Sequence, residues 1–98
     1  MPSAVPPPGL PAWAGRYAQR KTTACLVVYG TTCHLCRVEG ADTADHLIPR
    51  SKGGSDDLRN LRPAHHGCNS LRGDMSLADW FARHPVPHRA VLPPSRKW

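Results

Sequence analysis

The chain has 98 residues, and its 13 Lys and Arg against 7 Asp and Glu give a formal charge of +6. That length allows one small domain, whose limited core usually needs a metal or disulfides for stability. No apolar run approaches a membrane span, and the start lacks the basic and apolar regions of a signal peptide, so we expect a cytoplasmic protein without a membrane partner. The positive charge favours a polyanionic partner but identifies no chemistry.

The first two segments differ sharply in composition. Residues 1–12 hold five of the eleven prolines, which predicts a disordered leader outside the fold. Residues 13–29 predict a helix, although the β-branched residues in this segment leave a strand open. The apolar residues that would share one face of this helix are Trp13, Tyr17, Ala24, Val27 and Val28.

The rest of the chain predicts a hairpin followed by two short helices. Gly30 ends the first helical pattern, and a turn follows it. Two short strands are expected at residues 43–47 and 61–64, joined through a loop at residues 49–57. One short helix is expected at residues 66–72. Another should begin at Ser76, which has the Ser-x-x-acid form of a helix cap.

Two ligand pairs with the same spacing predict a structural zinc site. Cys33 and Cys36 are separated by two residues, as are His65 and Cys68. Thiolate and imidazole are the groups that Zn²⁺ prefers, and four protein ligands close a tetrahedral site to other chemistry. In a reducing compartment, such pairs hold a metal more often than they form a disulfide.

The remaining candidates near these pairs fit a zinc site less well. His66 could replace His65, but only His65 keeps the two-residue spacing. Cys25 has no partner at metal spacing, so it is interpreted as a residue of the helix core. His34 is interpreted as a turn residue.

The segment between the two pairs is longer than an ordinary zinc ribbon needs, and it carries several further motifs. In combination with the zinc pairs, these motifs over residues 30–74 resemble the HNH endonuclease family. The resemblance implies an α+β fold, a small ββα-metal domain of treble-clef-like form with a structural zinc and flanking helices. The motifs are Cys33-x-x-Cys36, Asp45-His46-Leu47-Ile48-Pro49, Gly53-Gly54-Ser55-Asp56-Asp57, Asn60-Leu61 and His65-x-x-Cys68-Asn69.

The resemblance also implies a role for four residues. His46 would be the general base, Asp45 and Asn69 would bind a catalytic divalent ion, and Asn60 would fix the loop and the orientation of the imidazole. Imidazole is partly unprotonated at neutral pH, as a base for phosphodiester hydrolysis must be. Carboxylate and amide oxygens suit Mg²⁺, Mn²⁺ or another divalent ion, and the few carboxylates nearby imply a single ion.

Some details of this pattern remain open at the level of sequence. Asp45 and His46 would point to opposite faces of an ideal strand, so we expect them at a strand end or irregularity. Asp56 and Asp57 are interpreted as solvated loop acids or a cap in preference to metal ligands. Asn69 stands where the family name expects His, and His65 where Cys is commoner, but both keep suitable donor atoms.

Several basic and aromatic residues lie in or near this segment. The basic ones could hold phosphates, although each could also be a solvated surface charge. They are Arg50, Lys52, Arg59, Arg62 and Arg72. Trp80 and Phe81 are predicted to belong to the core, while Trp98 could be a core or a base-stacking residue.

From the resemblance we predict a nuclease domain at residues 13–84, followed by a Pro-rich, basic tail at residues 85–98. The expected activity is hydrolysis of DNA phosphodiester bonds, with a phage or mobile-element setting and packaging proteins as possible partners. One alternative is a non-catalytic zinc module that binds nucleic acid, and another is a structural component of a larger assembly. Neither alternative accounts for Asp45, His46, Asn60 and Asn69 occurring together.

Overall fold

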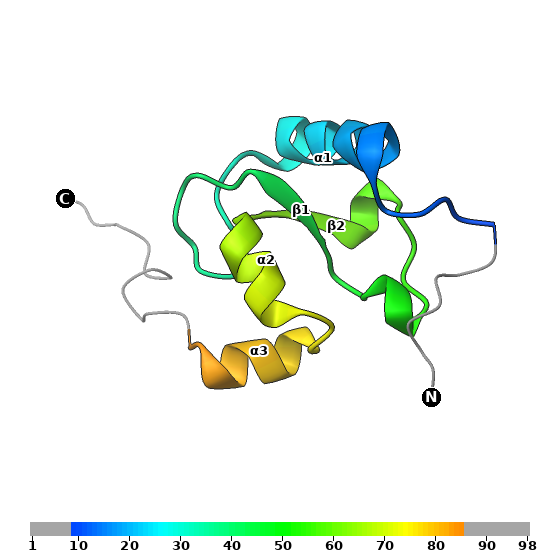
Figure 1. Cartoon of the computed structure of the whole chain (residues 1–98). Coiled ribbons are helices and arrows are strands. Elements are labelled where there is room, and N and C mark those ends of the chain that lie inside the picture. Colours follow the sequence, from blue (N-terminus) through cyan, green and yellow to red (C-terminus); the bar gives the residue numbers. More distant parts are fainter. Residues whose placement is uncertain (1–8, 86–98) are drawn as a thin grey trace.

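The computed structural model describes residues 9–85, and it confirms a small α+β fold (Figure 1). Most of the expected leader and tail, residues 1–8 and 86–98, lies outside the described residues. The connection between the strands contains two short 3-10 turns, one at Arg50–Lys52 within the expected loop and one at Leu58–Asn60 directly after it. The helices and strands are α1 (Gly15–Tyr29), β1 (Thr43–His46), β2 (Leu61–Ala64), α2 (His66–Arg72) and α3 (Leu77–Arg83).

The two strands form an antiparallel hairpin at the centre of the fold. Thr43 pairs with Ala64 and His46 with Leu61, so the long connection leaves and rejoins the hairpin at the His46 end. Helix α1 covers one side of the hairpin, and α2 and α3 lie on the other side (Figure 1). His46 is the last residue of β1, which places the Asp-His pair at a strand end.

Helix α1 is present, but its predicted apolar face is wrong in part. Val27 and Val28 are 78% and 59% exposed, whereas Cys25 is fully buried. Cys25 packs with Ala44 and Leu61 of the hairpin. Because successive helical residues turn by about 100°, a helix that buries Cys25 directs the side chain of Val27, two residues later, away from the sheet. No helix in the described part of the chain is long and apolar enough to span a membrane.

A second buried cluster joins the cysteine segment to the last helix. Its members are Cys33, Leu35, Ala41, Ala64 and Trp80. The indole of Trp80 donates a hydrogen bond to the Leu35 carbonyl oxygen at 3.1 Å, so α3 fixes the turn between the first two cysteines. The Ser76 hydroxyl accepts from the Asp79 amide at 3.0 Å, which is the helix cap that the sequence predicts.

Candidate functional site

The four predicted zinc ligands come together in space. Cys33, Cys36, His65 and Cys68 each offer a ligand atom, and these atoms all lie within 4.8 Å of one another. The Nδ1 atom of His65 is 3.3 Å from the Cys36 sulfur and 3.8 Å from the Cys68 sulfur. Zinc–sulfur bonds of about 2.3 Å place tetrahedral ligands at separations of this size. The donor set therefore fits a structural zinc.

His65 is oriented toward this cluster by a contact behind it. Its Nε2 atom lies 3.1 Å from the Glu39 carbonyl oxygen, which leaves Nδ1 to face the sulfurs. Gly40 permits that approach, since its φ is +109° and a Cβ there would lie 3.2 Å from His65 Nε2. Burial is the largest influence on the pKa of Cys33 and raises it, but backbone hydrogen bonds led by that of His65 outweigh it and lower the pKa to about 7. A thiolate ligand is thus accessible near neutral pH.

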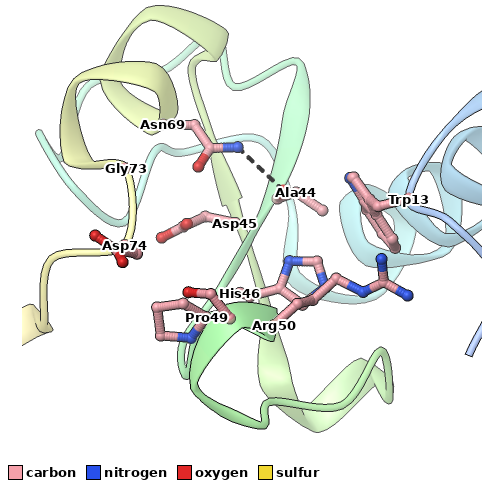
Figure 2. Close-up of a pocket in the computed structure, with 10 residues that line it drawn as sticks. Trp13, Ala44, Asp45, His46, Pro49, Arg50, Asn69, Gly73 and Asp74 are labelled. Atoms are coloured by element: carbon pink, nitrogen blue, oxygen red, sulfur yellow. Dashed lines mark hydrogen bonds between the residues drawn. The ribbon is translucent and has the colours of Figure 1, made fainter. Parts of the chain in front are cut away.

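A pocket of about 280 Å³ lies at the end of β1 and is separate from the zinc cluster. Asp45, His46 and Asn69 all line it. The side chains of Asp45 and Asn69 lie on the α2 side of the strand, and the imidazole of His46 lies on the side of Trp13 and Arg50 (Figure 2). The pocket therefore wraps around the strand end, which is how two neighbouring residues of opposite orientation reach one site.

Asp45 is buried and firmly held through one of its two oxygens. Oδ2 lies 2.7 Å from His34 Nε2 and accepts a hydrogen bond from the Arg72 guanidinium at 2.6 Å. Within the described part of the chain, Oδ1 has no hydrogen-bond partner. His34 does lie in a turn, as expected, but its contact with Asp45 was not predicted.

Arg72 is buried, so its interpretation as a phosphate-binding or solvated residue is wrong. Its guanidinium donates to the carbonyl oxygens of His46 at 2.6 Å and Leu47 at 2.9 Å, and its Nε donates to that of Met75 at 2.7 Å. Together with Asp45, these acceptors surround the positive charge. Arg72 therefore joins the end of α2 to the end of β1 and fixes the backbone of the pocket.

The imidazole of His46 contacts an aspartate from the loop. Its Nε2 atom lies 2.8 Å from Oδ1 of Asp56, whose carboxylate also accepts from Tyr17 Oη at 2.6 Å and Arg50 Nε at 3.0 Å. Burial is the largest influence on the Asp56 pKa and raises it, but the donors from Tyr17 and His46 and the charge of Arg50 lower it below its usual value. The view of Asp56 as a solvated loop acid is wrong, because only 3% of the residue is exposed.

Asn60 fixes the loop, as the resemblance implied. Its side-chain oxygen accepts from the Ile48 amide, and its side-chain nitrogen donates to the carbonyl oxygens of Ile48 and Ser55. Gly54 lets this loop close tightly, since a Cβ there would lie 1.7 Å from the Ile48 carbonyl oxygen. The side-chain contact that orients the imidazole comes from Asp56 and not from Asn60.

Asn69 and two unpredicted residues complete the polar lining. The Asn69 side-chain nitrogen donates to the Ala44 carbonyl oxygen at 3.3 Å, so the amide oxygen is left for another partner. Asp74 and Ser51 also line the pocket. Among residues 9–85, the Ser51 hydroxyl is the buried side-chain polar atom that has no hydrogen-bond partner. A polar atom without a partner in a pocket is consistent with a site where a ligand supplies the missing hydrogen bond.

Comparison with known proteins finds one family for the central segment of the chain. A family model for the HNH endonuclease matches residues 33–75, which include both zinc pairs, Asp45, His46 and Asn69. No curated protein and no solved structure shows a significant match. The matched segment is the part of the fold that carries both the zinc cluster and most of the pocket. Residues 33–75 therefore match the HNH endonuclease family, which is the family that the motifs of the sequence resemble.

Proposed function

We propose that this protein is a metal-dependent endonuclease that hydrolyses phosphodiester bonds of DNA. The observation that supports this most directly is the pocket at the end of β1, where an imidazole lies beside a carboxylate and an amide. The match of residues 33–75 to the HNH endonuclease family supports the same reaction, and the formal charge of +6 suits a polyanionic substrate. In this proposal the zinc cluster stabilises the fold, and the pocket carries the chemistry.

His46 is the general base of the proposed reaction. Its Nε2 atom is engaged by Asp56, so Nδ1 is the atom that can remove a proton from the attacking water. A neutral imidazole keeps a lone pair on one of its two ring nitrogens, which is the form a base requires. The Trp13 ring lies edge-on to the imidazole, with 4.6 Å between ring centres, and limits its rotation.

Asp45 and Asn69 are the proposed ligands of a catalytic divalent ion such as Mg²⁺ or Mn²⁺. The oxygens that they leave unpaired within the described part of the chain, Asp45 Oδ1 and Asn69 Oδ1, are the hard donors such ions prefer. Arg72 and His34 hold the other Asp45 oxygen, which orients the free one. The ion would supply positive charge to the phosphate and the leaving oxygen. A neutral amide and one carboxylate fit one ion better than two.

Two exposed basic residues in the connection between β1 and β2 remain available to DNA phosphates. Lys52 is exposed, and the side chain of Arg59 is 88% exposed with a long 3.7 Å ion pair to Asp57. Arg50 and Arg72 make internal contacts instead. Phosphate contacts of this kind position a nuclease without reading sequence.

The test is cleavage of supercoiled plasmid by the purified full-length protein with Mg²⁺, Mn²⁺ or Ni²⁺. We expect nicking that depends on added metal, disappears in His46→Ala, and persists in His66→Ala. His66 is a matched control because it is an exposed histidine on α2, outside the pocket. A gel-shift measurement should show that His46→Ala still binds DNA.

Two outcomes would contradict the proposal. DNA binding without cleavage under any metal would support the rival zinc module that only binds nucleic acid, and neither binding nor cleavage would support a structural component. Parallel assays with RNA test the choice of DNA. The setting among phage or mobile-element proteins and the assignment of residues 13–84 as the nuclease domain stay predictions.

A further inference from the structure

Helix α1 lies before the family-matched segment, yet it contacts the residues around the proposed base. Tyr17 and Asp56 are 39 residues apart in the sequence, but the Tyr17 hydroxyl donates a hydrogen bond to Oδ2 of Asp56 at 2.6 Å. The opposite oxygen of the same carboxylate, Oδ1, lies 2.8 Å from His46 Nε2. A continuous chain of two hydrogen bonds therefore runs from α1 through the loop to the imidazole.

Asp56 is held at the centre of this chain by three side chains from different elements. Arg50 donates through Nε at 3.0 Å and through a terminal nitrogen at 3.3 Å, Tyr17 through its hydroxyl, and His46 through Nε2. The side chain of Asp56 is 2% exposed, so water cannot replace a lost donor easily. A buried carboxylate with fixed donors has one orientation.

That orientation determines which nitrogen of His46 carries the proton. An ionised carboxylate only accepts, so the imidazole must present Nε2–H to Asp56, and the lone pair is then on Nδ1. Arg50 and Tyr17 keep the carboxylate from rotating away from the imidazole. Lys21 lies over the Tyr17 ring at 5.7 Å and so packs on its outer face.

We propose that Tyr17 is a positioning residue for the reaction, acting through Asp56 to hold the imidazole of His46 in the orientation and tautomer that the base requires. This inference rests on the proposed function, because it assigns Tyr17 to the base of that reaction. It extends the active unit beyond residues 33–75 to include α1. Trp13, which packs on the same imidazole, belongs to the same extension.

The test compares Tyr17→Phe with Tyr29→Phe in the full-length protein. Tyr29 is a matched control because it lies on the same helix and donates one hydrogen bond, at 3.0 Å, to the Leu58 carbonyl oxygen away from the pocket. We expect Tyr17→Phe to lower kcat about tenfold with little change in KM for DNA, the size of effect expected when one hydrogen bond to a charged group is lost. Tyr29→Phe should keep the wild-type kcat.

A second measurement follows the imidazole directly by ¹⁵N NMR, without turnover. In the wild type, the neutral imidazole of His46 should carry its proton on Nε2 and none on Nδ1. Asp56→Asn should mix the two tautomers and Tyr17→Phe should shift the Nε2 signal, whereas Tyr29→Phe should leave it unchanged. A purely structural role for Tyr17 would change the melting temperature and neither kcat nor this signal.

The possible failures are distinguishable. If the wild type cleaves and Tyr17→Phe matches it in kcat and in the His46 signal, the positioning role is wrong and the proposed function stands. If both tyrosine variants lose kcat equally, the effect belongs to helix packing, which also contradicts the proposal. If the wild type does not cleave under any metal, the proposed function fails and the role of Tyr17 fails with it.

Discussion

His34 and Asp45 are 2.7 Å apart, measured from the histidine Nε2 to the carboxylate Oδ2. His34 lies between the zinc-cluster residues Cys33 and Cys36, and its backbone amide donates to the Pro63 carbonyl oxygen of β2 at 2.8 Å. The side chain of Asp45 is 4% exposed. The turn that carries two of the proposed zinc ligands therefore also orients the carboxylate proposed to hold the catalytic ion, so the two proposed metal sites share one rigid connection.

Replacing His34 with Ala is expected to weaken binding of the catalytic ion while leaving the zinc in place. The variant leaves Arg72 as the partner of the Asp45 carboxylate, which can then rotate more freely. A hydrogen bond to a charged group contributes about 1.5–3 kcal/mol at most. We expect the Mn²⁺ concentration for half-maximal nicking to rise about tenfold, with one zinc per chain retained by elemental analysis. An unchanged Mn²⁺ dependence would show that Arg72 alone is sufficient to orient Asp45.

Removing a zinc ligand should unfold the domain. Zinc binding contributes about 10 kcal/mol or more to the folding of small peptides, which is comparable to the total stability of a domain. Cys36→Ala is therefore expected to lose zinc and the cooperative thermal transition seen by circular dichroism. Cys25→Ala is the control, because Cys25 is buried outside the cluster. Its zinc content should be unchanged and its melting temperature only moderately lower.

The zinc cluster, the helices and the strands were predictable because all of them follow from the spacing of residues within the sequence. The cap at Ser76 and the paired ligands are local patterns, and the structure places them as expected. The environment of the proposed base was not predictable in this way. Tyr17 and Arg72 reach Asp56 and Asp45 across 39 and 27 residues, and no periodicity signals such contacts. The identity of a charged residue in the sequence does not indicate whether the fold buries or exposes its side chain.

Asp56 is expected to make the stability of the fold sensitive to acid. Its pKa is lowered in the folded state, so its contribution is present above the unfolded pKa of about 4 and is lost as the pH falls through the folded value. Urea unfolding from pH 7 to pH 3 should show a steeper loss of unfolding free energy for the wild type than for Asp56→Asn, which is less stable at pH 7.

The control for this titration is Asp57→Asn, whose side chain is 60% exposed. It should follow the wild-type curve, because the exposed Asp57 carboxylate makes only a long 3.7 Å ion pair with Arg59, and exposed pairs contribute little to stability. Protonation of the zinc ligands is common to all three proteins, so only the difference between their curves reports on Asp56. Parallel curves for wild type and Asp56→Asn would show that the carboxylate has no net preference for its folded environment.

Substitution of Arg72 should destabilise the fold far more than substitution of its neighbour Leu71, although charged residues usually tolerate change better than leucines. The Arg72 side chain is fully buried, and its loss leaves the Asp45 carboxylate and three carbonyl oxygens without that donor. Breaking a buried ion pair costs about 3–5 kcal/mol, so Arg72→Ala should unfold at much lower urea than the wild type. Leu71 is 66% exposed, and Leu71→Ala should change the unfolding free energy by less than about 0.5 kcal/mol.

Arg72→Lys distinguishes the effect of the charge from that of the hydrogen-bond geometry. A lysine keeps the positive charge, but it lacks the planar guanidinium that donates to several acceptors at once, so it should recover only part of the stability. Full recovery by lysine would mean that the charge beside Asp45 stabilises the strand end and that the carbonyl contacts contribute little.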